Sequence, residues 1–106
     1  MSETFQRIRA LAARGEVEVS RHGLRELVTR SIVLEDILAS VDDAVIVEDY
    51  CEAWKGPSVL VLQHDGAGRP IHVLWGISRE TMTPAVLITA YQPDLRRWTA
   101  DFMRRV

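Results

Sequence analysis

Apolar residues in the first third of the chain recur every three to four positions, which is the period of an α-helix. The first set with this spacing consists of Phe5, Ile8, Leu11 and Ala12. Because Gly15 stands where a helix would end, the pattern predicts a helix over residues 3–14. Ser20 is a good N-cap for a second helix that ends near Ser31, and a third helix is predicted over residues 34–41.

From residue 44 onward the pattern changes to the alternation that is typical of β-strands. Segments rich in valine, leucine and isoleucine are predicted as strands at residues 44–50, 58–63, 69–76 and 85–91. The Asp-Gly-Ala-Gly sequence at residues 65–68 is typical of a hairpin turn. The alternating glutamates and valines of residues 16–19 indicate a short strand or an extended linker. Residues 94–106 are predicted as a short C-terminal helix or a packed tail.

These elements predict one α+β domain over residues 1–106, with two to three N-terminal helices packed on a mainly antiparallel four-stranded sheet. A chain of this length can bury a core without disulfides or metal ions. No apolar run is long enough to cross a membrane, and residues 1–14 contain no apolar signal core. Because the lone Cys51 cannot form an internal disulfide, we expect a reducing compartment, the cytoplasm.

The formal net charge of -2 argues against a general nucleic-acid coat protein, which would need an excess of basic residues to neutralise phosphates. The charges are nevertheless segregated along the chain. Residues 1–30 carry six arginines against four glutamates, residues 35–52 carry seven acidic residues and no base, and residues 96–106 carry four arginines against one aspartate. Arginine supplies twelve of the thirteen bases, which suits forked hydrogen bonds to carboxylate or phosphate, although a GC-rich genome produces the same bias.

One set of residues has the chemical types needed for catalysis: His22 on the second helix, His72 in a central strand, and Thr89 and Tyr91 in the last strand. Residues two apart in a strand share a face, so Thr89 and Tyr91 point the same way. If the second helix packs across that face, His22 and Arg25 would join them. Imidazole, phenol and guanidinium groups together could cleave a phosphodiester without a metal ion. Alternatively, these groups are satisfied polar contacts that tie the helix to the sheet.

Other classes of site have weaker support in the sequence. The three histidines lack the close spacing of structural zinc ligands, so neither a metal ion nor another cofactor is expected. Cys51 is interpreted as a small packed side chain rather than a nucleophile. Trp54, Trp75 and Trp98 could stack on bases, but they lie in different segments, and packing is the simpler use of all three.

Segments in a consistent order along the chain resemble the bacterial family known as domain of unknown function 4258 (DUF4258), over residues 17–105. The segments are residues 20–22, Arg30, Ile32, and residues 46–50, 56–58, 69–73 and 88–94, with Trp98, Asp101, Phe102 and Arg105. The resemblance implies a compact domain with helices followed by a sheet, distantly similar to small RelE/BrnT-like toxin folds. It places the family's two histidines at His22 and His72, and its threonine and tyrosine at Thr89 and Tyr91.

The chain departs from the family pattern at two positions. The family often has an arginine four residues after the first histidine, where this chain has Glu26, so Arg25 or Arg30 would have to contact a phosphate instead. Val33 stands where the family tends to have serine or threonine, so a side-chain cap worth roughly 1 kcal/mol is expected to be missing from the third helix.

The leading functional hypothesis is a toxin-like, metal-independent endoribonuclease or ribosome-associated domain, one half of a toxin–antitoxin pair. In this hypothesis His22 and His72 transfer protons, Tyr91 and Thr89 position the substrate, and Arg25 or Arg30 binds phosphate. The alternative is a non-catalytic interaction domain whose acidic residues 35–52 bind a basic protein partner. A homodimer formed through an exposed edge strand is compatible with either hypothesis.

Overall fold

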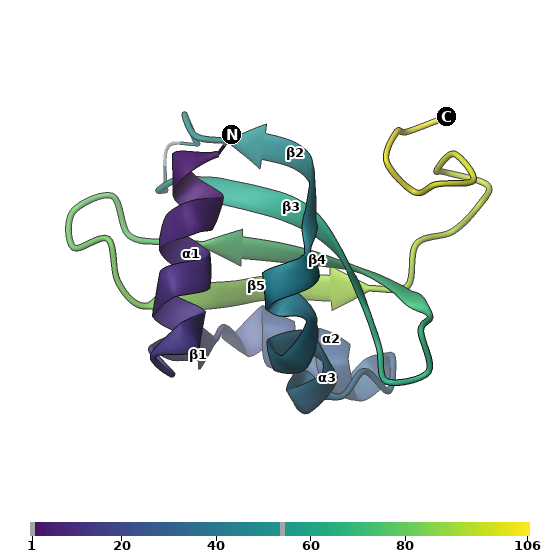
Figure 1. Ribbon diagram of the computed structural model, residues 1–106, viewed down its shortest axis with the longest axis horizontal. Coiled ribbons are helices and arrows are strands. Elements are labelled where there is room, and N and C mark those ends of the chain that lie inside the picture. The colour runs from purple at the N-terminus through teal and green to yellow at the C-terminus, as the bar shows by residue number, and fades with distance from the viewer. Residues whose placement is uncertain (1, 54) are drawn as a thin grey trace.

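The helices lie in the first part of the chain with one short strand between the first two, and the remaining strands of the sheet follow them (Figure 1). The computed structural model describes residues 2–53 and 55–106. Its elements are α1 (Glu3–Ala13), β1 (Val17–Val19), α2 (Arg21–Thr29), α3 (Leu34–Ser40), the 3-10 turn η1 (Val41–Asp43), β2 (Val45–Tyr50), β3 (Ser58–His64), β4 (Pro70–Gly76) and β5 (Ala85–Tyr91). The predicted α+β class is confirmed.

The sheet has five strands rather than the predicted four, in the order β1-β5-β4-β3-β2. The pairs β2–β3, β3–β4 and β4–β5 are antiparallel, whereas β1 runs parallel to β5, with Val17 opposite Ala85 and Val19 opposite Leu87. The additional strand is β1, in the segment for which the sequence indicates either a short strand or a linker. Three residues form a ladder only when a distant strand offers hydrogen-bond partners. Here β5 provides these partners.

The apolar core lies between the helices and one face of the sheet. Helix α1 contributes Phe5, Ile8 and Leu11, and alternate residues of β4 contribute Ile71, Val73 and Trp75. Figure 1 shows α1 and α3 on the viewer's side of the sheet, with α2 farther back. Because strand residues alternate between faces, the residues of β4 between these core positions point to the opposite side of the sheet.

Helix α2 is held close against β5 at its first turn. The Ser20 hydroxyl caps the helix by accepting a hydrogen bond from the Gly23 N–H, and it donates to the Ile88 carbonyl oxygen. A Cβ atom at Gly23 would lie 2.6 Å from the Leu87 carbonyl oxygen. A glycine is therefore required there for the helix to approach the strand. The predicted cap at Ser20 is confirmed, and Val33 begins α3 without a side-chain cap, as expected.

Residues 94–106 form a packed tail, the second of the two predicted arrangements. The tail folds back on itself, so that Trp98 and Arg105 form an isolated bridge. The Asp94 carboxylate accepts a hydrogen bond from the Arg96 N–H, and the Asp101 carboxylate accepts one from the Met103 N–H. Such local side-chain bonds favour turns over a helix, which explains why the helical spacing of apolar residues produced no helix here.

In the described part of the chain, no helix has the length and apolar character needed to span a membrane.

A buried glutamine joins α3 to the sheet. Gln63, 1% exposed, donates through its amide nitrogen to the Ile37 carbonyl oxygen at 2.7 Å and to the Ser40 hydroxyl at 2.9 Å. Its amide oxygen accepts from the Trp75 indole N–H at 2.9 Å. The amide nitrogen of Gln63 therefore bonds to α3, while the amide oxygen bonds to Trp75 of β4.

We expect Q63L to lower the free energy of unfolding by about 2–3 kcal/mol, because it leaves the buried Trp75 N–H without an acceptor. Urea unfolding followed by far-UV circular dichroism measures the change. H64Q, at the exposed neighbouring position, is the control and should unfold like the wild type. Equal stability of Q63L and the wild type would contradict this role of the amide.

Candidate functional site

His72 lies on β4, the central strand of the sheet, on the face opposite the apolar core. In the strand register it stands opposite Leu62 of β3 and Tyr91 of β5. The imidazole is fully buried. Trp98 of the tail covers it, with the two rings edge to face and their centroids 4.4 Å apart. The tail therefore closes this face of the sheet over a polar side chain.

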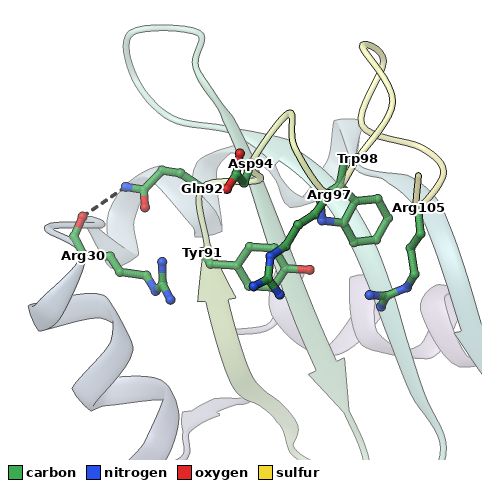
Figure 2. A pocket seen from close by; sticks show the side chains of 7 residues that line it. All are labelled: Arg30, Tyr91, Gln92, Asp94, Arg97, Trp98 and Arg105. Carbon is green, nitrogen blue, oxygen red and sulfur yellow. Dashed lines mark hydrogen bonds between the residues drawn. The ribbon is translucent and has the colours of Figure 1, made fainter.

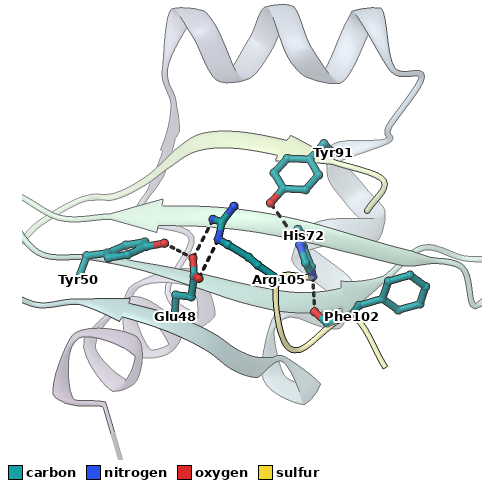
Figure 3. Close-up of polar contacts among 6 residues, drawn as sticks. All are labelled: Glu48, Tyr50, His72, Tyr91, Phe102 and Arg105. Atoms are coloured by element: carbon teal, nitrogen blue, oxygen red, sulfur yellow. Dashed lines mark hydrogen bonds and ion pairs between the residues drawn. The ribbon is translucent and has the colours of Figure 1, made fainter. Parts of the chain in front are cut away.

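Both nitrogens of the His72 ring have partners (Figure 3). Nε2 lies 2.8 Å from the Phe102 carbonyl oxygen, and Nδ1 lies 3.2 Å from the Tyr91 hydroxyl. Because a carbonyl oxygen only accepts, Nε2 must carry the proton and donate it. In the neutral ring, Nδ1 then accepts a hydrogen bond from the Tyr91 O–H. The contacts thus select one tautomer of a neutral imidazole.

Burial sets the direction of the pKa shifts in this pair. Removal of the imidazole from water lowers the pKa of His72, against the smaller raising effects of the Phe102 bond and of Glu48. Burial likewise raises the pKa of Tyr91 above its usual value. Both groups are therefore neutral at pH 7, and the Tyr91 proton is directed toward an unprotonated nitrogen.

An ion pair fixes the end of the tail to β2. The Arg105 guanidinium donates through Nε and Nη2 to the two carboxylate oxygens of Glu48, each at 3.0 Å, and the Tyr50 hydroxyl donates to the same carboxylate (Figure 3). The bonds from Arg105 hold the pKa of Glu48 below its usual value. The Arg105 guanidinium also lies 4.6 Å from the centre of the Trp98 ring. The geometry is the forked arrangement that makes arginine–carboxylate pairs specific.

A pocket of about 570 Å³ opens beside this cluster (Figure 2). It is lined by Arg30 at the end of α2, Tyr91 and Gln92 at the end of β5, and Asp94, Arg97, Trp98 and Arg105 of the tail. Three of the lining residues are arginines and one is an aspartate. Arg30 is paired with Glu26, Arg105 with Glu48 and Asp94 with Arg96, and none of these three partners lines the pocket. Among residues 2–53 and 55–106, Arg97 makes no ion pair, so it is the lining arginine that an anion can reach without displacing a carboxylate. The pocket therefore suits an anion.

The structure brings together some of the predicted site residues. His72 and Tyr91 are in contact, and the Arg30 guanidinium lies 6.0 Å from the centre of the Tyr91 ring. Thr89 pairs with Leu74 and lies two residues before Tyr91, on the face that His72 occupies. His72, Tyr91 and Arg30 thus form one continuous group at the pocket.

His22 and Arg25 do not reach this group. Both are exposed on α2, and within the described ranges no hydrogen bond, ion pair or ring contact joins His22 to another residue. The helix runs along β5, so its first turn lies beside Leu87, whereas its C-cap, Arg30, bonds through its carbonyl oxygen to Gln92. Arg30 is eight positions after His22, which is about 12 Å along the helix axis.

Sequence reasoning did not predict the charged residues Glu48, Arg97 and Arg105 as part of the site, nor Gln92, Asp94 and Trp98 as pocket residues. The basic composition of residues 96–106 was a signal for the two arginines, but nothing local indicated a partner for them. Glu48 was grouped with the acidic segment, whereas its carboxylate pairs with an arginine 57 residues away. The ion pair between Glu48 and Arg105 therefore forms only in the folded chain.

Other candidate residues have structural positions or lie outside the site. Trp75 is fully buried in the core and Trp98 is 4% exposed, so neither offers a free ring face for a base. Trp54 lies outside the described residues. Cys51 is exposed, which contradicts its interpretation as a packed side chain, because the turn after β2 leaves it at the surface. Among the residues that the structure describes, no group of three potential metal ligands occurs.

The sequence model of a family described as a domain of unknown function (DUF4258) matches residues 19–92. The chain belongs to the DUF4258 family. The match includes His72 and Tyr91 but ends before the tail, so it is shorter than the expected resemblance over residues 17–105. No curated protein and no solved structure matches the chain. The likeness to RelE/BrnT-like toxins therefore stays a prediction.

We expect His72 to make the fold less stable as the pH falls from 7 to 5. The unfolded chain binds a proton near the ordinary histidine value of 6.5, while the buried ring, whose pKa is lowered, stays neutral. The contribution of the neutral His72 to the free energy of unfolding is therefore complete above about pH 6.5. It declines at lower pH by at most about 1.4 kcal/mol per pH unit. Urea unfolding across this range measures the slope.

H72Q should be less stable at pH 7 but should lose this part of the pH dependence. H64Q removes an exposed histidine and serves as the control, with the wild-type slope. The carboxylates with lowered pKa values titrate below this range and do not interfere. The same slope in H72Q and the wild type would show that His72 is not the titrating group.

Proposed function

We propose that this domain binds RNA, as a free strand or on the ribosome, and holds a phosphate group in the pocket of Arg30, Arg97 and Arg105. The observation that carries the proposal is that three arginines from the end of α2 and the tail line one open pocket, and that Arg97 among them makes no ion pair with the described residues. Arginine forks match the oxygens of a phosphate, and charge-assisted bonds of this kind are about twice as strong as neutral ones. The attraction is local, since the whole chain carries a net charge of -2.

The remaining groups at the pocket favour a nucleic-acid backbone over a simple anion. The Tyr91 hydroxyl and the Gln92 amide stand next to the arginines and provide neutral hydrogen-bonding groups. Arg25 lies exposed on the same helix as Arg30 and would extend the basic surface for a neighbouring phosphate. Binding would be expected to weaken with salt, as for other phosphate-directed contacts.

RNA cleavage is the second candidate function, and the bond between Tyr91 and His72 favours it. Cleavage next to a 2′-hydroxyl needs a group that takes its proton and a group that protonates the leaving oxygen. Tyr91 can accept the 2′-hydroxyl proton as its own proton passes to Nδ1 of His72, 3.2 Å away, and the reverse transfer through Tyr91 would return a proton to the leaving oxygen. His22 is exposed on α2, so we assign it no position at the phosphate. Thr89 is assigned a role in positioning Tyr91.

We expect R97A and R30A each to weaken binding of a fluorescently labelled ten-nucleotide single-stranded RNA by about tenfold, the loss of one charge-assisted contact. Fluorescence anisotropy at low and moderate salt measures the affinity. R14A is the matched control: Arg14 is exposed and pairs with Glu16, so its removal should change affinity less than about twofold.

A denaturing gel of the same RNA separates binding from cleavage. Cleavage by the wild type that is lost in Y91F, with affinity retained, would establish the second candidate function. Intact RNA together with tight binding would show that the domain binds RNA without cleaving it. If R97A, R30A and the wild type bind RNA equally, or none binds at low salt, the proposal is wrong and a protein partner at residues 35–52 becomes the better hypothesis.

A further inference from the structure

The proposed anion pocket is built from two parts of the chain that are joined by contacts outside the pocket. Arg30, Tyr91 and Gln92 belong to the helix and sheet. The other lining residues, Asp94, Arg97, Trp98 and Arg105, all belong to the tail. Two of the three arginines are therefore in place only when residues 94–106 lie against the sheet.

The tail is attached to the domain rather than part of its main core. None of its residues belongs to the core cluster between helices and sheet, whose last member is Ala90. Within the tail, the described backbone pairing is a single bridge between Trp98 and Arg105, together with turns. A segment with so little regular structure can open locally while the core stays folded.

Three contacts hold the tail down, and His72 takes part in two of them. Its Nε2–H donates to the Phe102 carbonyl oxygen at 2.8 Å, and its ring packs against the edge of Trp98. The third contact is the ion pair between Arg105 and Glu48. His72 is fully buried and does not line the pocket, so it acts on the pocket through the tail.

We propose that ligand binding and tail docking are one coupled equilibrium, in which a phosphate-bearing ligand closes residues 94–106 on the sheet and His72 is the positioning residue that latches them. This inference rests on the proposed function. Coupling of this kind is reciprocal, so whatever loosens the tail must weaken the ligand, and the ligand must tighten the tail. The ligand needs no contact with His72 for this effect.

Hydrogen–deuterium exchange of the full chain, with and without the ten-nucleotide RNA, tests the coupling. The informative amides are those of Thr99, which bonds to the Arg104 carbonyl oxygen, and of Val106, which bonds to the Arg97 carbonyl oxygen. We expect RNA to slow their exchange, while amides of α1, remote from the pocket lining, exchange at the same rate.

Two variants loosen the latch and keep all three pocket arginines in the sequence, although E48Q also changes the partner of one of them, Arg105. H72Q changes the contact with Phe102 and Trp98, and E48Q removes the charge that pairs with Arg105 from the surface of β2. In each, the tail amides should exchange faster and RNA affinity should fall by about fivefold or more. Exchange of the α1 amides should stay at the wild-type rate, which separates tail opening from general unfolding. E48Q keeps the test open if H72Q does not fold.

The outcomes distinguish this inference from the proposed function. If RNA binds and depends on Arg30 and Arg97, but tail exchange is the same with and without RNA, the coupling is overturned and the binding site stands. Wild-type affinity in both latch variants, with faster tail exchange, overturns it as well. If RNA does not bind at all, the proposed function fails and the coupling fails with it.

Discussion

The arrangement of the second sheet face depends on one constraint: the fully buried imidazole of His72 must have a partner at each ring nitrogen. A buried polar group without a partner costs about 1–3 kcal/mol, a large part of the stability of a small domain. The partners that meet this need are the Tyr91 hydroxyl and a carbonyl oxygen 30 residues farther along the chain. Satisfying one side chain therefore orients the tyrosine and also places the tail.

The two faces of the sheet are consequently built in different ways. One face is closed by helices through apolar packing, with Gln63 as a fully bonded polar link. The other is closed over His72 by a tail whose specific contacts are a histidine bond, a ring contact and an ion pair. Apolar burial stabilises without fixing direction, whereas hydrogen bonds and forked ion pairs fix orientation. The division places stability on the first face and the candidate site on the second.

The boundaries of this site show how far sequence reasoning can reach. Helix starts such as Ser20 follow from local capping chemistry, and the shared face of His72 and Tyr91 follows from strand alternation. The pairing of β1 with β5 and the bond from Arg105 to Glu48 join segments far apart, and no local pattern specifies them. His22 is exposed on α2 and does not contact His72 or Tyr91, which the sequence could not show, because helical spacing shows which face a residue occupies but not how far along a strand the helix lies.

The family match adds a further constraint on how the site should be interpreted. It covers His72 and Tyr91 and ends at residue 92, whereas two of the three pocket arginines come afterwards. The histidine–tyrosine pair and Arg30 can therefore be attributed to the family region, but the other two arginines of the pocket belong to the tail of this chain. A neutral tyrosine bonded to a neutral histidine does not attract an anion by itself, because neither carries charge at pH 7. The arginines of the pocket and the histidine–tyrosine pair are thus separable parts of the candidate site, in contact where Trp98 packs against His72.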